Sequence, residues 1–119
     1  MKVINYILKS KGKILLQKRD NKSNILYPGE WCFPGGMVEK NEKLFDACIR
    51  ECREETGVIV NKIEYLCDHY YSTGQKSRFF IVEGDGDVIS NEGKMYWKTL
   101  EEIKEIKLAD NQNEIIKKL

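Results

Sequence analysis

The chain has 119 residues, of which 41% are hydrophobic and 33% charged, a composition typical of a folded domain rather than of a disordered chain. Its 20 basic and 19 acidic residues leave a formal net charge of +1, so a nucleic-acid binder that works through a broad basic surface is not expected. No segment has the length and apolarity of a secretory signal or a membrane span, and we expect no membrane partner.

The N-terminal part is predicted to be extended. Alternating apolar residues indicate β-strands over residues 2–8 and 13–19, separated by a turn at 10–12. A polar loop follows over 20–29, and the segment 31–38 is expected to hold two short extended pieces broken by a Pro-Gly-Gly turn.

A helix is predicted over residues 43–56, and Gly57 supplies the usual helix-ending residue. At 100° per residue, Phe45, Cys48, Ile49 and Cys52 form one stripe, which we expect to pack against a sheet. The N-terminus of this helix is weakly defined because a lysine side chain at position 43 cannot accept the first amide hydrogens. This leaves a cap by Asn41 or a frayed first turn.

The second half of the chain mixes strands and short helices. Residues 59–71, 78–82 and 94–97 are rich in β-branched and aromatic side chains and are predicted as strands, with a loop, and room for a short edge strand, over 83–93. Thr99 is expected to cap a short helix that ends near residue 105, and Asp110 a final helix to residue 119. Together the elements predict an α/β fold, with a mixed β-sheet between helices.

Four cysteines, at positions 32, 48, 52 and 67, show no Cys-x-x-Cys spacing, and His69 is the only histidine. We therefore predict buried thiols rather than a zinc site or disulfides, which fits the reducing cytosol and a cytoplasmic location.

The chemistry-bearing feature is a group of acids on the predicted helix. Glu51, Glu54 and Glu55 stand at i, i+3 and i+4, so they share one face and repel one another. Hard divalent cations take oxygen ligands, and such a group can hold one or more of them. The alternative is a solvated acidic face with salt bridges to Arg50, Arg53 or Lys43, and the triplet alone does not exclude it.

The residues around the triplet decide between these interpretations. The segment 36–58 fits the pattern G-x5-E-x7-R-E-U-x-E-E-x-G-U, in which U is apolar, without a mismatch. The matching residues are Gly36, Glu42, Arg50, Glu51, Cys52, Glu54, Glu55, Gly57 and Val58. Seven fixed matches have chance odds on the order of 10⁻⁷ to 10⁻⁸ per start position. The segment resembles the Nudix box, the signature of the Nudix hydrolase family.

Other segments are similar to the family as well. Residues 31–36 resemble its W-x-x-P-G-G entry, residues 15–19 its second strand, and residues 97–103 its C-terminal tryptophan strand and short helix. The resemblance implies one Nudix domain over residues 1–119, folded as an α/β/α sandwich.

The resemblance also implies a metal site and an activity. Glu51, Glu54 and Glu55 would be the metal ligands, helped by a backbone carbonyl of Gly35 or Gly36. The ion would be Mg²⁺, with Mn²⁺ as an alternative. The reaction would be hydrolysis of a phosphoanhydride bond in a nucleoside diphosphate linked to another group.

Catalytic roles are carried over residue by residue. Arg50 would hold the carboxylates through salt bridges, with Glu42 as a possible partner. The general base varies within the family, and the candidates here are Glu54, Glu55 and Glu92, the last in the acidic loop before Trp97.

For the substrate, the sequence resembles the MutT-type branch, which implies a (deoxy)nucleoside triphosphate such as 8-oxo-dGTP, cleaved to the monophosphate and pyrophosphate. Candidate contacts are Arg19 for phosphate, Phe33 for stacking, Gly35 for close backbone approach, and Asp110 or Asn111 for a purine edge. The competing interpretations are a solvated strand end for Arg19, a core position for Phe33 and a helix cap for Asp110.

Two other readings stay open. The chain is a Nudix hydrolase of a nucleotide sugar, a dinucleoside polyphosphate or an RNA 5′ end, or it is a non-catalytic domain that senses nucleotide. In each case the expected partner is a small nucleotide, and the protein is expected to be a monomer or a homodimer.

Overall fold

The computed structural model describes residues 2–21, 27–86, 88 and 94–119. Its strands are β1 (Val3–Ser10), β2 (Lys13–Lys18), β3 (Trp31–Cys32), β4 (Gly35–Met37), β5 (Ile59–Tyr70), β6 (Lys76–Asp85) and β7 (Lys94–Thr99). Its helices are α1 (Leu44–Thr56), α2 (Leu100–Lys104), the 3₁₀ turn η1 (Ala109–Asn111) and α3 (Asn113–Ile116).

The strands form one mixed sheet. Its order is β3-β2-β1-β6-β5, with β4 paired to β1 and β7 paired to β2. The central strands β1 and β6 run parallel, with Val3 opposite Ser77 and Lys9 opposite Glu83, whereas the other pairs are antiparallel. The sheet thus has the mixed character predicted from the sequence.

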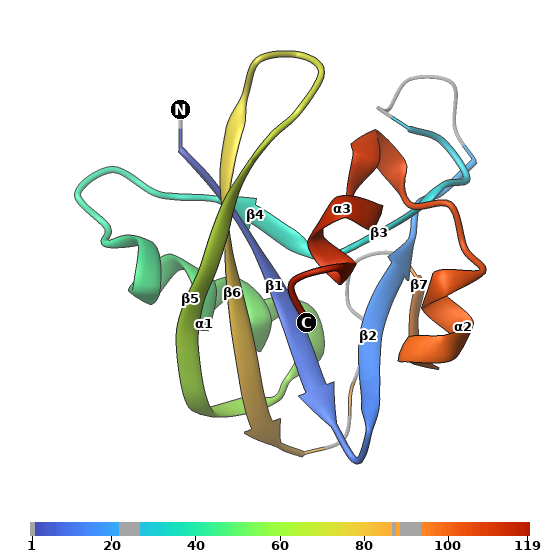
Figure 1. Ribbon diagram of the computed structural model, residues 1–119. Helices are drawn as coiled ribbons and strands as arrows, with labels where there is room; N and C mark the ends of the chain where they lie inside the picture. Colours follow the sequence, from blue (N-terminus) through green and yellow to red (C-terminus); the bar gives the residue numbers. More distant parts are fainter. Residues whose placement is uncertain (1, 22–26, 87, 89–93) are drawn as a thin grey trace.

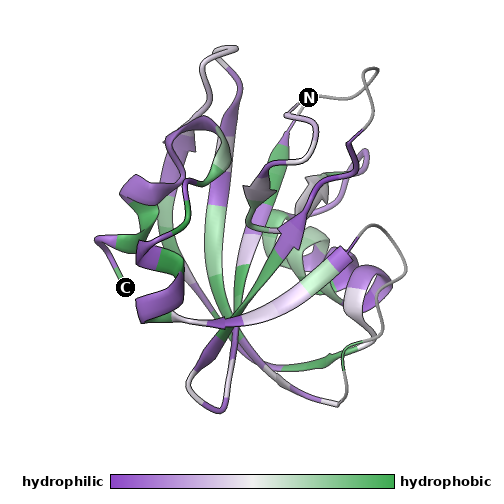
Figure 2. Cartoon of the chain, turned by 90° about the vertical axis from the view of Figure 1, so that its right-hand side faces the viewer, coloured by the Kyte–Doolittle hydropathy of each residue, from purple (hydrophilic) through white to green (hydrophobic). Residues whose placement is uncertain are grey.

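The two faces of the sheet carry two hydrophobic clusters because strand side chains alternate between faces. In β1, Ile4, Tyr6 and Leu8 face α1, and Ile7 belongs to the cluster on the opposite face. Figure 1 shows α1 on one side of the central strands and α2 and α3 on the other. Hydrophobic residues gather in the strands, and hydrophilic ones in the loops and outer helix turns (Figure 2). The expected α/β/α sandwich is confirmed.

Helix α1 ends as predicted but packs differently. Gly57 has φ +74°, and its N–H donates to the Arg53 carbonyl at 2.8 Å. Cys48 and Cys52 are buried with Ala47, whereas Phe45 and Ile49 are 47% and 38% exposed. The predicted stripe was therefore half wrong, because the buried face is rotated toward Ala47 and includes Glu55 and Thr56.

The helix caps show mixed agreement with the expectations. Thr99 caps α2 in a full capping box with Glu102, as predicted. Asp110 does not cap a final helix: it has φ +49°, and α3 begins after Gln112 and ends at Ile116. The first turn of α1 has Lys43 at its N-cap, without a side-chain hydrogen bond. Asn41 therefore does not act as that cap.

Strand β6, the cysteines and the helix lengths can also be compared with the predictions. Strand β6 continues through residues 83–85, which had been expected to be loop, because Lys62 pairs with Glu83 and Ile59 with Asp85. All four cysteines are buried and free, as predicted. Among the described helices, none has the length and apolarity required to cross a bilayer.

Candidate active site

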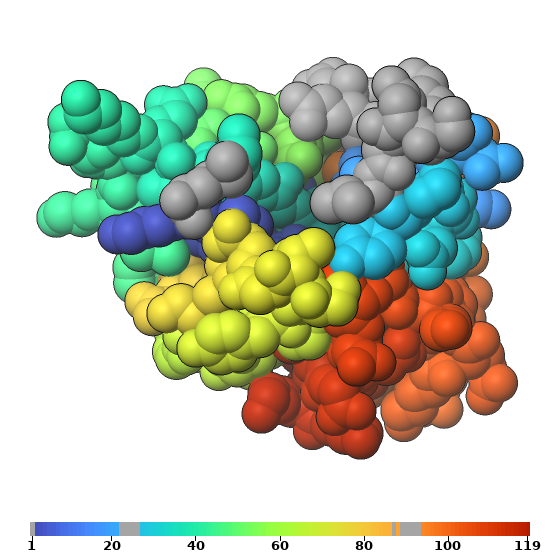
Figure 3. All heavy atoms as spheres, turned by 90° about the horizontal axis from the view of Figure 1, so that it is seen from above, coloured from blue at the N-terminus to red at the C-terminus, as the bar shows by residue number. Residues whose placement is uncertain are grey.

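A cavity of about 580 Å³ opens at the end of the sheet where β1 begins. Its walls come from the start of β1, the end of β2, the β3–β4 segment, the β5–β6 turn and the η1 region. Seen from above in Figure 3, the β5–β6 turn in yellow lies against the cyan segment near residue 30. The volume of the cavity lies within the range of about 300–1,000 Å³ that is usual for small-molecule sites.

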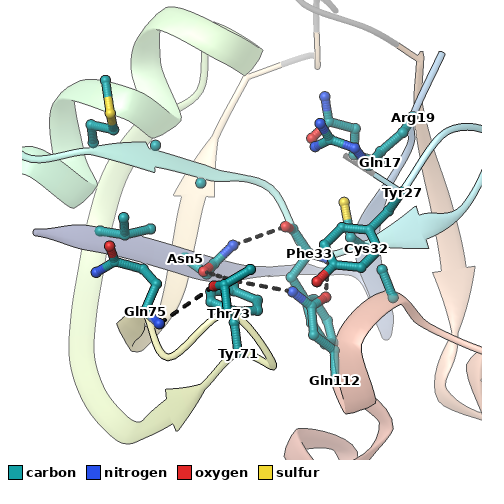
Figure 4. A pocket seen from close by; sticks show the side chains of 15 residues that line it. Asn5, Gln17, Arg19, Tyr27, Cys32, Phe33, Tyr71, Thr73, Gln75 and Gln112 are labelled. Carbon is teal, nitrogen blue, oxygen red and sulfur yellow. Dashed lines mark hydrogen bonds between the residues drawn. The ribbon is translucent and has the colours of Figure 1, made fainter. Parts of the chain in front are cut away.

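A buried polar network forms one wall (Figure 4). Asn5 donates to the Phe33 carbonyl at 3.0 Å and accepts from the hydroxyls of Tyr71 at 2.6 Å and Ser77 at 2.5 Å. The Gln112 side chain accepts from the Phe33 N–H at 2.8 Å and donates to the Tyr71 oxygen at 3.3 Å. Burial raises the pKa of Tyr71 to about 12, so its hydroxyl stays protonated. The network joins four segments distant in sequence.

Asp110 does not line the cavity but connects neighbouring chain segments through hydrogen bonds. Its carboxylate accepts from the Tyr27 hydroxyl and from the Ser72 N–H at 2.9 Å. Its backbone carbonyl contacts His69 Nε2 at 2.8 Å. Neither Asp110 nor Asn111 lines the cavity, although their neighbours Ala109 and Gln112 do.

The cavity is also lined by Gly35 and Gly36, the second of which begins the predicted box. A Cβ on Gly35 would lie 2.2 Å from the Ile4 carbonyl oxygen, and one on Gly36 would lie 2.3 Å from Glu51 Cδ. Both distances are far below contact distance, so a side chain at 35 would collide with backbone, and one at 36 would have to displace the Glu51 carboxylate. The Glu51 carboxylate therefore lies directly against the glycine backbone that lines the cavity.

Arg50 organises the outer side of the acidic helix. Its Nε donates to Glu42 at 2.8 Å, its Nη1 to Glu51 at 2.9 Å and to Glu54 at 3.2 Å, and its Nη2 to the Met37 carbonyl at 3.0 Å. The hydrogen bond from Arg50 lowers the pKa of Glu42 to about 2. Planar guanidinium donors suit this multiple carboxylate contact.

Glu55 is buried and is contacted from the sheet by Tyr6 of β1. Its side chain is 3% exposed, and its Oε1 accepts from the Tyr6 hydroxyl at 2.9 Å. Burial and the Glu55 charge raise the pKa of Tyr6. Glu54 instead points outward, with 53% of its side chain exposed.

The glutamates thus occupy three environments: Glu51 against glycine, Glu54 in solvent and Glu55 in the interior. Within the described residues, no three His, Cys, Asp or Glu side chains converge tightly enough to define a metal cluster. The donor set still fits a hard divalent cation, because it consists of carboxylates and leaves room at Gly36 for close backbone approach. Glu92, the other candidate base, lies outside the described residues.

The structure brings three of the expected substrate contacts, Arg19, Phe33 and Gly35, to the cavity. The Phe33 ring, which was expected to stack on the substrate, is instead a core side chain: it is 1% exposed and packs edge-on against Phe79, with ring centroids 5.9 Å apart. Arg19 lies beside the Cys32 thiol, whose pKa is raised by burial and lowered in part by this neighbour.

Sequence reasoning missed Asn5, Tyr27 and Gln112 as cavity residues. One signal was present. Asn5 interrupts an otherwise apolar and aromatic strand segment, and a buried amide needs partners. Gln112 and Tyr27 carried no such signal.

An α/β/α sandwich that places a carboxylate-bearing helix beside a nucleotide-sized cavity is the arrangement expected of a metal-dependent enzyme acting on a phosphorylated ligand. The family model described as "NUDIX domain" matches residues 1–119, and the chain therefore belongs to the Nudix hydrolase family. Members of this family generally use divalent metal ions and act on small nucleotides.

Individual relatives agree with this assignment. The chain is 33% identical over 117 residues to an 8-oxo-dGTP diphosphatase of Buchnera aphidicola, covering 96% of this chain and 88% of that protein. It is 39% identical over 69 residues to a CTP pyrophosphohydrolase of Escherichia coli, covering 58% of this chain and 50% of that protein. A solved MutT structure, from work on Aliivibrio salmonicida and Vibrio cholerae, is 23% identical, has a TM-score of 0.82, and covers 98% of this chain and 93% of that one.

Proposed function

We propose that this chain hydrolyses a (deoxy)nucleoside triphosphate to the monophosphate and pyrophosphate with the help of Mg²⁺. The observation that carries the proposal is the position of Gly36. Gly36 lines the cavity, and the Glu51 carboxylate lies directly against it. A nucleotide in the cavity would therefore have its phosphates beside the acidic helix.

The side chains suggest a division of labour. When bound, a divalent cation neutralises the phosphoanhydride and lowers the pKa of an attacking water. Glu51, Glu54 and Glu55, with the Gly36 carbonyl, would hold it. Arg50 Nη1 donates to both Glu51, at 2.9 Å, and Glu54, at 3.2 Å. These two hydrogen bonds limit the conformational freedom of the carboxylates. Fixing ligands through outer contacts of this kind is what a metal site requires.

The exposed position of Glu54 favours it as the proton acceptor. A general base must reach the water from which it takes the proton. The Glu54 side chain is 53% exposed, whereas Glu55 is 3% exposed. We therefore assign proton transfer, in addition to ligation, to Glu54 and ligation alone to Glu55.

The nucleobase of the substrate would contact polar side chains of the cavity. The cavity is lined by Tyr71, which brings a hydroxyl group, by Gln75, which brings an amide, and by Arg19 for phosphate. These groups suit a nucleobase edge. The near full-length similarity to an 8-oxo-dGTP diphosphatase supports an oxidised purine nucleotide as the first substrate to test.

The test incubates purified protein and Mg²⁺ with 8-oxo-dGTP, dGTP, CTP, ADP-ribose and diadenosine tetraphosphate, and measures monophosphate and pyrophosphate release. The Glu54→Gln variant should lose about 100-fold or more of the turnover. Glu64→Gln, an equal change at an exposed residue of β5, should retain it.

The outcomes separate the alternatives. Preferred release of pyrophosphate from a triphosphate supports the proposal, and chelation by EDTA should abolish it. Preferred hydrolysis of ADP-ribose or of diadenosine tetraphosphate would show that the substrate is not a nucleoside triphosphate. Folded protein that binds nucleotide without any turnover would indicate a sensor.

A further inference from the structure

The hydroxyl group of Tyr6 is not required for packing. Tyr6 lies in the middle of β1, is 0% exposed, and faces α1 within the hydrophobic cluster that includes Phe80 and Cys52. A phenylalanine would fill nearly the same volume. A buried hydroxyl group costs free energy unless it is hydrogen-bonded. The Tyr6 hydroxyl group therefore requires a hydrogen-bond acceptor in the interior.

That partner is Glu55, and the geometry is favourable. The phenolic O–H donates to Glu55 Oε1 over 2.9 Å, with both side chains buried. A carboxylate has two oxygens in one plane, so anchoring Oε1 restricts the direction in which the other oxygen points. Glu55 is reached in this way from the sheet, whereas Arg50 reaches Glu51 and Glu54 from the outer side.

The hydrogen-bond donors to the three glutamates differ in charge. Arg50 brings a positive charge to the two outer glutamates. The Tyr6 hydroxyl is neutral, so it orients Glu55 without competing for the negative charge that attracts a cation. A lysine or arginine in this position would pair with Glu55 and oppose cation binding.

We propose that Tyr6 is a positioning residue, which holds the buried Glu55 carboxylate in the orientation required to bind the divalent cation. The inference rests on the proposed function, because it takes Glu55 as a ligand. Outer contacts of metal ligands typically change metal affinity by about 10–100-fold when removed. We expect a loss in that range when the hydroxyl is deleted.

The experiment measures binding in the absence of nucleotide. Mn²⁺ is titrated into the metal-free protein, and free Mn²⁺ is followed by electron paramagnetic resonance. Tyr6→Phe removes only the hydroxyl and should weaken Mn²⁺ binding by about 10-fold or more. Tyr70→Phe, on the exposed end of β5, makes the same chemical change at a 67% exposed side chain and should leave the affinity unchanged.

A double-mutant comparison separates positioning from packing. In a Glu55→Gln background there is no carboxylate to orient, so adding Tyr6→Phe should change Mn²⁺ affinity by less than about 2-fold. Thermal unfolding followed by circular dichroism checks that each variant is folded. Tyr6→Met, which also lacks the hydroxyl, replaces Tyr6→Phe if the latter does not fold, and should show the same loss.

Unchanged Mn²⁺ affinity in folded Tyr6→Phe would overturn the inference. An equal loss with and without the Glu55 carboxylate would also overturn it, since the effect would then be one of packing. If the wild-type protein itself binds no Mn²⁺, the proposed function fails first. The two failures are therefore distinguishable.

Discussion

At the scale of single residues, Arg50 is the side chain that connects the acidic helix to the segment before it. One guanidinium contacts Glu42, Glu51 and Glu54 and the Met37 carbonyl. Lysine has a single point of charge and could not make these contacts at once. Arg50 therefore links Glu51 and Glu54 of the helix to Glu42 in the segment before it.

The Glu42–Arg50 contact predicts a dependence of stability on acid. The hydrogen bond from Arg50 lowers the pKa of Glu42 from 4.5 to about 2. Because the folded pKa lies below the unfolded one, this stabilisation is present above about pH 4.5 and is lost as the pH falls towards 2. We expect Glu42→Gln to lower the urea midpoint at neutral pH and to flatten its decline over that window.

The control for this prediction is Glu64→Gln, whose midpoints should follow the wild-type curve. The measurement compares urea midpoints across the acid window with those at neutral pH. Parallel curves for wild type and Glu42→Gln would show that Glu42 does not contribute the expected linkage.

At the scale of elements, α1 and α2 differ in how well the backbone N–H groups of their first turns are satisfied. Thr99 accepts from the Glu102 N–H at 3.2 Å, and the Glu102 carboxylate accepts from the Thr99 N–H at 2.9 Å. Helix α1 starts at Lys43, without any side-chain cap. The helix that bears the acidic residues is thus the less well terminated of the two at its N-terminus.

This difference predicts opposite effects of two cap substitutions. Thr99→Ala should lower the free energy of unfolding by about 1 kcal/mol, because a side-chain acceptor is lost. Lys43→Ser should raise it by about 0.5–1 kcal/mol, because an acceptor is gained. Chemical denaturation measures both, with Lys43→Ala as the control that removes the lysine without adding a cap. An equal gain for serine and alanine would assign the effect to lost charge.

At the scale of the whole molecule, stability comes from two clusters that the sheet keeps apart. Phe79 and Phe80 are neighbours in β6, yet each belongs to a different cluster. Phe45 covers the outside of one of them, with its ring centroid 5.0 Å from that of Phe80. Buried and peripheral aromatic residues should therefore differ sharply in their contributions.

We expect Phe79→Ala, at a side chain with 0% exposure, to cost about 3–5 kcal/mol of unfolding free energy. Phe45→Ala, at a side chain with 47% exposure, should cost about 1 kcal/mol, because much of that ring already contacts water. Urea denaturation of the two variants provides the comparison. Similar losses would mean that Phe45 is covered in solution, for instance by a second copy of the chain.

The sequence by itself determined the local and periodic features of this protein. The helix that ends at Gly57, the shared face of Glu51 and Glu54, and the alternation of β1 all depend on spacing within one segment. For the glycine pair at 35 and 36, the family resemblance implied close backbone approach, and in the structure a Cβ at 35 would lie 2.2 Å from the Ile4 carbonyl oxygen.

Only the tertiary structure decided which distant groups meet. Asn5, Tyr71 and Gln112 come from separate parts of the chain, and no local pattern predicts their network. The burial of Glu55 beside Tyr6 depends on the rotation of α1 against the sheet, and the same rotation leaves Phe45 exposed. That rotation is set by the packing of the two layers, a property that spacing along one helix does not contain.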